Sequence, residues 1–393
     1  MPDTKSTLHN PDLGPDLDSD QGLVSLSDSS GGSSAVLTRR PTWLPTYIPE
    51  LEGLRGLAVL AVVLYHCHQR LTGTWIYGPM LWGWAGVNLF FALSGFLITS
   101  ILLEAREKPH YFRNFYARRV LRIWPVYFLL LIVCYAVPEW FLGDTFAHQA
   151  RWPILLGYAL FIQNLRHTPL PGTLGPTWSL AIEEQYYLVW APVVRYCRGR
   201  LNWLLPVILL AMVAASPIFR LSHAHWLNTT HTLIHLEGIA MGSLISFCLY
   251  HLRMARRTWL WIGLVAAISG FVAAGTIFAG SAFLDTGLAL GFAGVVLVAV
   301  AGTGAANPVA MLLRRGPLAF YGRISYGLYM THILVFVYFG NFDARLDDKY
   351  HRGIPGNLAI VGLRLVASTV VATALWYGFE SQVLKLKRYF KSA

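Results

Sequence analysis

The stretch that decides the fold is Glu50-Leu-Glu-Gly-Leu-Arg55-Gly-Leu-Ala-Val-Leu-Ala-Val-Val-Leu-Tyr-His66. It is apolar enough to cross a membrane, yet it carries an arginine near its start and a histidine at its end. Ionisable groups in a spanning helix are costly, and they usually serve function. The spacing from Arg55 to His66 places both on one helical face, about 16 Å apart along the axis. The pattern predicts a helix with a polar track running between the membrane faces.

The composition extends this interpretation to the whole chain. Of the 393 residues, 55% are hydrophobic and 13% are charged, which is about half the charged share of a soluble domain. Several apolar runs reach the ~20 residues that cross a bilayer. We therefore predict an all-α, polytopic transmembrane helical bundle and an integral membrane protein.

Ten apolar runs predict the individual membrane spans. They are 51–69, 83–103, 120–137, 178–197, 202–219, 231–250, 258–279, 284–302, 320–340 and 357–380. A further apolar piece, 153–165, is shorter and is bounded by Pro153 and by a Pro- and Gly-rich stretch. Its length suits a re-entrant or interfacial helix better than a span.

The distribution of basic residues favours ten spans with both termini in the cytoplasm. With that topology, 23 of the 31 Lys and Arg residues lie inside, seven lie outside and Arg364 lies in the last span. If 153–165 also crossed the membrane, every later basic cluster would lie on the side opposite the cytoplasm. Basic residues gather in cytoplasmic loops, so they account for the net charge of +11. We predict no nucleic-acid partner.

The composition also divides the chain into three parts. Residues 1–46 are rich in Asp, Ser, Gly and Pro, which predicts a disordered cytoplasmic tail. Residues 47–384 form the transmembrane domain, and 385–393 form a basic cytoplasmic C-terminal tail. No basic start leads into an apolar region at the N-terminus, so we expect no signal peptide. The four cysteines show no metal-ligand spacing, and we predict no metal site.

The second span carries polar residues within Gly86-Val-Asn-Leu-Phe-Phe-Ala-Leu-Ser-Gly-Phe-Leu-Ile-Thr99. Asn88 is expected at the depth of His66, and its amide needs a partner, either His66 or a backbone carbonyl. Ser94 and Gly95 lie deeper. Small residues of this kind allow close packing of helices, which is the alternative to a functional role for Ser94.

A basic segment, Arg118-Arg119-Val-Leu-Arg122-Ile-Trp-Pro125, precedes the third span. Arg118 and Arg122 are one helical turn apart, so a helix would present them together. Guanidinium groups bind phosphate oxygens well, which suggests a site for a cytoplasmic anionic nucleotide. Ordinary positive-inside charge in contact with lipid headgroups is the alternative.

Two later spans begin with functional side chains. Trp178-Ser-Leu-Ala-Ile-Glu183-Glu184 places two adjacent carboxylates near the membrane edge. They cannot face the same way on a helix, so one is expected to face the bundle and orient a histidine, and the other to face water. Tyr321-Gly-Arg-Ile-Ser-Tyr-Gly-Leu-Tyr-Met-Thr-His332 places a further histidine in an apolar run. It either packs or takes part in the site.

Together these five segments resemble acyltransferase family 3, the integral-membrane O-acyltransferases that modify cell-surface sugars and similar acceptors. They occur in the family's order and cover about residues 48 to 380. The resemblance implies ten spans, essential Arg55 and His66, and acyl-CoA (acetyl-CoA) as a cytoplasmic co-substrate without a permanently bound cofactor. The family usually has Asp at the position of Asn88. Because about a dozen residues follow the last span, we expect the stand-alone form.

The resemblance implies a bacterial inner-membrane enzyme that moves an acyl group to a hydroxyl of a carbohydrate or glycolipid. We expect Arg118, Arg119 and Arg122 to bind the phosphates of acyl-CoA. His66 would act as base or acyl carrier, helped by Arg55 and by Glu183 or Glu184. Substrate contacts are expected at Asn88, Ser94, Trp178, Ser179, Tyr326 and His332. A transporter of a sugar lipid or anion is the main alternative, since intramembrane charges fit that class too. A non-catalytic scaffold or receptor is the other.

Overall fold

The described part of the chain is helical throughout. The computed structural model describes residues 40–136, 152–165, 172–222, 227–306, 308–314, 316–350 and 353–390, and of 152, 153 and 341–350 no side chain is described. Within these ranges there is no β-strand. The predicted disordered tail lies outside them except for residues 40–46, and so do the last three residues of the predicted C-terminal tail.

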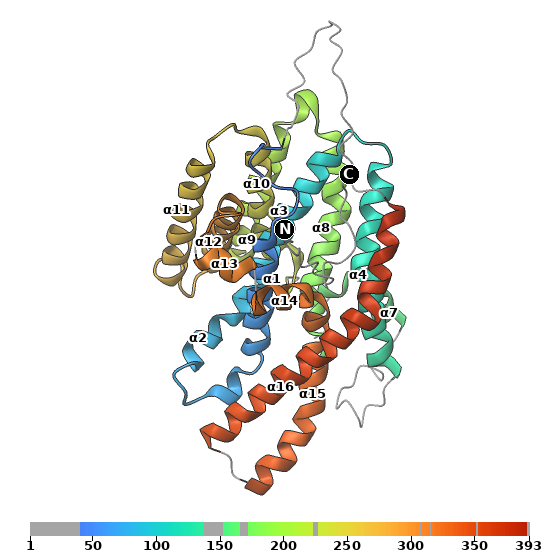
Figure 1. Cartoon of the computed structure of the whole chain (residues 1–393), viewed down its shortest axis with the longest axis vertical. Helices are drawn as coiled ribbons and strands as arrows, with labels where there is room; N and C mark the ends of the chain where they lie inside the picture. Colours follow the sequence, from blue (N-terminus) through green and yellow to red (C-terminus); the bar gives the residue numbers. More distant parts are fainter. Residues whose placement is uncertain are drawn as a thin grey trace, which may run out of the picture. The chain divides into compact units, whose positions relative to one another are not determined.

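The helices follow one another in the order shown in Figure 1. The α-helices are α1 (Pro49–Tyr65), α2 (Tyr77–Leu81), α3 (Gly86–Ala105), α4 (Tyr111–Ala136), α7 (Trp152–Ala159), α8 (Thr177–Tyr196), α9 (Leu204–Leu221), α10 (Leu236–His251), α11 (Arg256–Gly275), α12 (Leu284–Ala301), α13 (Pro308–Arg314), α14 (Pro317–Arg323), α15 (Ser325–Tyr350), α16 (Ile354–Leu375) and α17 (Ser381–Leu384). Short 3-10 helices are η1 (His68–Leu71), η2 (Trp82–Ala85), η3 (Gln163–Leu165), η4 (Gly172–Leu174), η5 (Gly199–Leu201), η6 (Thr232–Ile234) and η8 (Lys385–Tyr389), and η7 (Trp376–Glu380) is π-helical.

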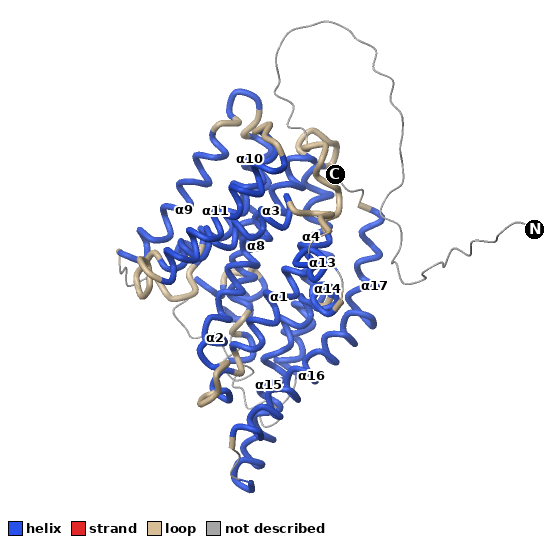
Figure 2. The backbone as a smooth tube through the Cα atoms, turned by 60° about the vertical axis from the view of Figure 1, so that its left-hand side comes forward, coloured by secondary structure: helices blue, strands red, loops and turns tan. Residues whose placement is uncertain are grey.

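Helix α1 is the element against which much of the bundle packs. It contacts α3, α12, α13, α14 and α15, and its position among them is visible in Figures 1 and 2. Its apolar side chains are buried on more than one face: Leu51, Leu54, Val59, Val62 and Val63 are each at most 3% exposed. An apolar helix buried in this way belongs to the interior of a bundle.

Glycines bring α1 into direct backbone contact with α13 and α14. A Cβ on Gly53 would lie 2.2 Å from the Leu313 carbonyl oxygen, and one on Gly56 would lie 2.1 Å from that of Leu318. On the other side of the contact, a Cβ on Gly322 would lie 2.0 Å from the Glu52 carbonyl oxygen. No side chain fits these gaps, so glycine is required for the approach, and this places Arg55 beside the start of α15.

The start of α1 is also held by a buried carboxylate. Glu50 is 1% exposed. Its Oε2 accepts a hydrogen bond from Thr303 Oγ1 at 2.8 Å, and its Oε1 accepts one from the Gly304 backbone N–H at 3.0 Å. Arg314 Nε lies 3.4 Å from the same Oε1. A buried charge is stable only with such partners, so this cluster ties α1 to the segment between α12 and α14.

Small residues also set the contact between α3 and α10. A Cβ on Gly95 would lie 2.0 Å from the Ile239 carbonyl oxygen, and one on Gly242 would lie 2.0 Å from that of Ala92. Close packing, the alternative considered for the Ser94-Gly95 pair, is therefore confirmed for Gly95. Ser94 has a different role, described below.

The helical, membrane-spanning class is confirmed, whereas the number of spans is supported only in part. Six described helical segments are long and apolar enough to cross a membrane: Tyr77–Ala105, Tyr111–Ala136, Gly199–Leu221, Arg256–Gly275, Leu284–Ala301 and Ile354–Tyr389. Helices also occupy the other four predicted positions, as α1, α8, α10 and α15. Of these, α1 has 17 residues and α10 has 16, which is near the lower limit of about 17 for a span.

Two boundaries differ from the sequence prediction, whereas the short piece 153–165 agrees with it. Helix α4 begins at Tyr111, so the arginine segment predicted to precede the third span belongs to the same continuous helix. The predicted ninth span is interrupted at Ile324, and residues 317–323 form the separate helix α14, which packs on α1. The doubtful piece 153–165 contains an α-helix, α7, of only eight residues, too short to cross a bilayer.

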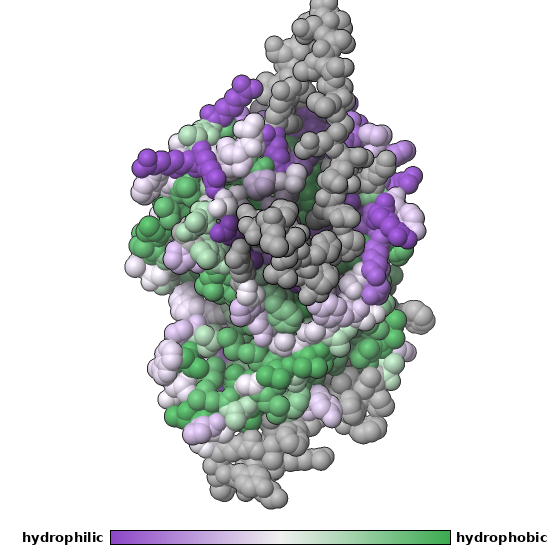
Figure 3. Space-filling model, viewed as in Figure 1, coloured by the Kyte–Doolittle hydropathy of each residue, from purple (hydrophilic) through white to green (hydrophobic). Residues whose placement is uncertain are grey.

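The surface agrees with a membrane-embedded chain. In Figure 3, hydrophobic residues cover the band occupied by α16, whereas hydrophilic residues gather near the end where α4 begins. Helix α16 lies alongside α15 in Figures 1 and 2. Its Val366 and Val370 are about 60% exposed, as expected for side chains that face lipid.

The α1–α14 contact predicts that adding a side chain at Gly322 destabilises the protein. We expect Gly322→Ala to lower the free energy of unfolding by roughly 1–3 kcal/mol, because the new methyl group overpacks the contact. The thermal midpoint of the purified protein in detergent would report this loss. Gly362→Ala in α16 is the matched control, since a Cβ there meets nothing within 4 Å. Equal midpoints for the two variants would contradict the assignment.

Candidate active site

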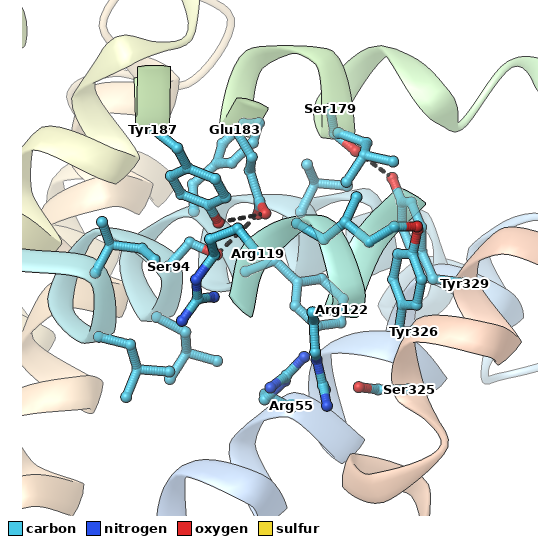
Figure 4. Close-up of a pocket in the computed structure, with 18 residues that line it drawn as sticks. Arg55, Ser94, Arg119, Arg122, Ser179, Glu183, Tyr187, Ser325, Tyr326 and Tyr329 are labelled. Atoms are coloured by element: carbon cyan, nitrogen blue, oxygen red, sulfur yellow. Dashed lines mark hydrogen bonds between the residues drawn. The ribbon is translucent and has the colours of Figure 1, made fainter. Parts of the chain in front are cut away.

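Three arginines converge on a cavity among α1, α3, α4, α8 and α15. We call it the arginine cavity (Figure 4). Arg55 comes from α1, and Arg119 and Arg122 come from α4. The apolar part of the lining comes mainly from α3. The other polar lining residues are Ser94, Ser179, Glu183, Tyr187, Ser325, Tyr326 and Tyr329.

Glu183 provides the negative charge of the arginine cavity. Its Oε1 accepts a hydrogen bond from Ser94 Oγ at 2.9 Å, and its Oε2 accepts one from the Tyr187 hydroxyl at 2.8 Å (Figure 4). Among the residues that line this cavity, all in the described part of the chain, it is the one carboxylate. The hydroxyls fix its position, and its charge partly balances the three guanidinium groups.

The α4 arginines divide between two environments. Arg119 and Arg122 face the cavity, and the Arg119 guanidinium lies 5.8 Å from the centre of the Tyr187 ring. Arg118 instead donates from Nη1 to the Phe390 carbonyl at 3.0 Å. The sequence pointed to Arg118 and Arg122 as the pair presented together, but the cavity presents Arg119 with Arg122. The reason is that the C-terminal segment packs on the α4 face that carries Arg118.

His66 opens into a second cavity, which we call the histidine cavity. It is lined by residues of α1, α3, α12 and α15 and of the segments around η4 and η6. Asn88 and Trp178, both predicted to bind substrate, line it as well. His66 itself is exposed to this space, whereas His332, on its other side, is fully buried. Within the described residues, no group of three or more His, Cys, Asp or Glu side chains is placed to hold a metal ion.

The two histidines form a pair whose protons can be assigned from their acceptors. His332 Nδ1 lies 2.8 Å from the Tyr329 carbonyl oxygen. A carbonyl only accepts, so this nitrogen carries the proton, and Nε2 of the neutral ring is an acceptor. His332 Nε2 lies 3.4 Å from His66 Nδ1, which is also 2.8 Å from the Val62 carbonyl oxygen. His66 therefore carries its proton on Nδ1, and its Nε2 has a free lone pair.

This pair corrects the expectation that a glutamate orients His66. His332 and the Val62 carbonyl hold the ring instead. Glu183 lies two turns into α8 and faces the arginine cavity. Glu184 lines neither cavity, and its Oε2 accepts from Trp124 Nε1 at 3.2 Å. The adjacent carboxylates therefore do face different ways, as predicted, but neither is bonded to the histidine. The expectation that the second carboxylate faces water is wrong, because Glu184 Oε1 is buried.

Asn88 has a charged partner on another helix. Its Nδ2 donates to Asp285 Oδ1 at 3.4 Å, and Asp285 lines the histidine cavity. Arg220 Nη1 lies 3.5 Å from Asp285 Oδ2, and Arg220 Nη2 lies 2.6 Å from Glu237 Oε1. We expected His66 or a backbone carbonyl as the partner of Asn88. The structure instead shows that its partner is a carboxylate of α12.

Tyr329 and Val87 line both cavities and so form their common wall. The Tyr329 hydroxyl lies 2.7 Å from Ser179 Oγ and donates to the Pro176 carbonyl at 3.2 Å. Tyr326, one turn earlier, donates to the Ile123 carbonyl at 2.6 Å. These bonds join α15 to α4 and to the start of α8. They fix the wall that separates the arginines from His66.

Several residues of these cavities were not predicted from the sequence, among them Tyr187, Ser325, Tyr329 and Asp285. For two of them, the sequence contained a pattern from which they could have been predicted. Tyr187 follows Glu183 at a spacing of four, which places both on one helical face. Asp285 is a lone carboxylate at the start of an apolar run, and such residues are functional candidates. Tyr329 and Ser325 carried no signal that distinguished them from packing residues.

The comparisons with known proteins identify the family of the chain. The family model described as "Acyltransferase domain" matches residues 48–377. The chain is 36% identical over 157 residues to the peptidoglycan O-acetyltransferase OatA of Listeria monocytogenes, covering 37% of this chain and 24% of that protein. It is 27% identical over 328 residues to the O-acetyltransferase OatA of Staphylococcus aureus, covering 75% of this chain and 51% of that protein. The chain thus spans about half or less of these relatives' lengths. No solved structure matches it significantly.

The family match, together with the apolar helices long enough to cross a membrane, identifies the class of protein as a membrane acyltransferase. The chain belongs to acyltransferase family 3. The segments that carried the resemblance are those that build the two cavities, since Arg55, Ser94, Arg122, Glu183 and Tyr326 all line the first one. Membership in an acyltransferase family does not favour the transporter alternative.

The charge balance of the arginine cavity gives a second prediction. Glu183→Gln removes the one carboxylate that lines this cavity beside its three guanidinium groups, and we expect a loss of roughly 1–3 kcal/mol in unfolding free energy. Added sulfate should restore part of the loss by screening the arginines. Glu184→Gln is the control, because its partner Trp124 can donate equally well to an amide oxygen. Thermal unfolding in detergent, with and without sulfate, measures both. Similar midpoints for the two variants would rule out this role.

Proposed function

We propose that this protein is a membrane O-acetyltransferase that moves an acetyl group from cytoplasmic acyl-CoA to a hydroxyl of a cell-envelope carbohydrate. The single observation that carries the proposal is the pair of cavities that meet at Tyr329. One holds three arginines, and the other holds a histidine with a free ring nitrogen. The relatives named as peptidoglycan O-acetyltransferases support a glycan as the acceptor.

The arginine cavity suits the phosphate-bearing donor. Guanidinium groups form charge-assisted hydrogen bonds with phosphate oxygens, and Arg119 and Arg122 offer two such groups on adjacent turns of α4. Arg55 lies on α1, the helix that ends at His66. A slender acyl chain that passed Arg55 along this helix would approach Tyr329 and then His66. The apolar lining from α3 suits the uncharged part of the donor.

The histidine cavity suits the acceptor hydroxyl. His66 Nε2 would take the hydroxyl proton as the oxygen attacks the thioester carbonyl carbon. The tetrahedral intermediate would collapse with loss of the coenzyme A thiolate, and the imidazolium would return the proton to that sulfur. As the positive charge forms on His66, its Nδ1–H bond to His332 Nε2 strengthens. His332 is therefore a positioning residue in this scheme and not a substrate contact.

Aromatic and amide groups around His66 suit a sugar. The Trp178 and His235 rings lie 4.8 Å apart at the edge of the cavity, and Asn88 and Asp285 offer a hydrogen-bonding pair across it. Small-ligand sites commonly combine apolar rings with a few fixed polar groups of this type. We propose that these four residues contact the acceptor.

The proposed topology follows the asymmetry of the basic residues. It has ten spans, with both termini on the cytoplasmic side of a bacterial inner membrane. The arginine cavity would then take the donor from the cytoplasm, and the histidine cavity would lie in the outer half. Residues 1–46 and 385–393 would be cytoplasmic.

His66→Ala tests the chemistry directly. We expect transfer from radiolabelled acetyl-CoA to glycan to fall by roughly 10²–10⁴-fold, the usual range for loss of a general base. Near-normal activity of the correctly inserted variant would disprove the proposal. Label that stays on the wild-type protein without acceptor would indicate an acyl-histidine instead of a base.

His332 should act on turnover and not on donor affinity. We expect His332→Leu to lower kcat by roughly tenfold, the effect of losing about 1.4 kcal/mol of stabilisation, with the KM for acetyl-CoA unchanged. His332→Gln keeps an acceptor oxygen and should recover part of kcat. A purely structural role would lower both variants alike.

Arg119 and Arg122 should instead act on donor affinity and not on turnover. We expect Arg119→Ala and Arg122→Ala each to raise the KM for acetyl-CoA by roughly tenfold, since a hydrogen bond to a charged group contributes about 1.5–3 kcal/mol. Arg118→Ala should change it less, because Arg118 is bonded to the Phe390 carbonyl. Steady-state kinetics with varied acetyl-CoA would decide. Unchanged KM values for Arg119→Ala and Arg122→Ala would remove the phosphate assignment.

A further inference from the structure

A third cavity lies where α3 leads into α4 and where α8 ends. We call it the turn cavity. Its volume of about 400 Å³ falls in the range of small-molecule sites, roughly 300–1,000 Å³. Neither the proposed chemistry nor the proposed acceptor site uses it. Its lining includes Lys108, Arg113, Arg195 and Arg198, and the rings of Phe112 and Tyr196.

The turn cavity carries surplus positive charge. None of its lining residues, all of them within the described ranges, is acidic. One carboxylate lies beside it: Glu107 Oε2 accepts from Arg198 Nη1 at 2.8 Å and lies 3.8 Å from Arg195 Nη1. Four cationic side chains thus share one nearby carboxylate. This balance favours a ligand with more than one negative charge.

Aromatic faces accompany this charge. The Phe112 and Tyr196 rings lie 6.1 Å apart and are tilted by 41°, so they do not stack on each other, and one face of Phe112 is stacked on Tyr116. Tyr196 is 68% exposed, so its ring is accessible to a ligand. Aromatic faces beside cationic side chains bind nucleotides, since a base stacks on the ring and phosphates pair with the cations.

The turn cavity lies at a fixed distance from the arginine cavity. Phe112 and Arg119 are two turns apart on α4 and point to nearly the same side, about 10 Å along the axis. Tyr187 and Arg195 on α8 span a similar rise, about 12 Å. Two helices therefore run from one cavity to the other. An extended ligand could occupy both.

We propose that the turn cavity binds the 3′-phosphoadenosine end of acyl-CoA. The adenine would stack on Phe112 or Tyr196, and the 3′-phosphate would pair with Lys108 and Arg113. The diphosphate and the pantetheine arm would then lead along α4 and α8 to Arg119 and Arg122. This inference rests on acyl-CoA as the donor in the proposed function. A phospholipid headgroup shares the phosphate chemistry, but it has no ring to stack on these aromatics.

Donor analogues test the site. We expect the Lys108→Ala/Arg113→Ala double variant to raise the KM for acetyl-CoA by roughly tenfold, with kcat unchanged, from the loss of charge-assisted bonds. With acetyl-dephospho-CoA, which lacks the 3′-phosphate, wild type and variant should have similar KM values. Tyr196→Ala should weaken both nucleotide donors and leave acetyl-phosphopantetheine unaffected. Arg200→Ala is the control: an exposed cation of the same segment that does not line the cavity.

Two results would overturn the assignment. The first is a KM change that is equal for all three donors, or no change for any of them. The second is a variant effect that appears in nanodiscs containing phosphatidylglycerol and disappears in nanodiscs of phosphatidylcholine alone. That outcome would identify the cavity as a headgroup site.

A binding measurement separates this inference from the proposed function. Titration calorimetry with adenosine 3′,5′-bisphosphate needs no turnover. Binding to wild type that weakens roughly tenfold in the double variant supports the site, even if no acetyl transfer is found. Transfer activity with equal binding in both proteins overturns the site and leaves the proposed function intact.

Discussion

The direct backbone contact of α1 with α13 and α14 is the constraint on which the site depends. Gly53, Gly56 and Gly322 leave no room for a side chain, so α1 is pressed against its neighbours over most of its first half. This contact fixes both the depth and the rotation of α1. Arg55, next to Gly56, then lines one cavity, and His66 at the helix end lines the other. A shift of α1 by one turn, ~5.4 Å, would misplace both groups.

The wall between the cavities explains why the two polar groups of α1 do not meet. Tyr329 is bonded to Ser179 and to the Pro176 carbonyl, so α15 and the start of α8 form the wall shared by the cavities of Arg55 and His66. A donor held by arginines and an acceptor that reaches a histidine from the other side would meet only at this wall. The arrangement is consistent with the transfer proposed above, in which donor and acceptor occupy different cavities.

Buried charges elsewhere show how the bundle tolerates its polar interior. Glu50 is satisfied by Thr303, Gly304 and Arg314. Arg220 is shared between Glu237 and Asp285. Each charge has opposite charges or hydrogen-bond partners at close range, which offsets the cost of removing it from water. These clusters tie α1 to the segment after α12, and α9 to α10 and α12, so they stabilise the elements around the cavities.

The sequence by itself determined the helical membrane class, the positions of the helices, and the two polar groups of α1, because hydropathy and helical periodicity are local properties of the chain. It also identified most of the polar residues that line the arginine cavity. Only the tertiary structure decided their partners. His66 pairs with His332, 266 positions away, and Asn88 pairs with Asp285, 197 positions away. Such pairs depend on how helices are rotated against one another. The rotation of α4 likewise turns Arg119 into the arginine cavity and Arg118 toward the C-terminal segment. No local pattern in a single sequence encodes how a helix is rotated against its neighbours.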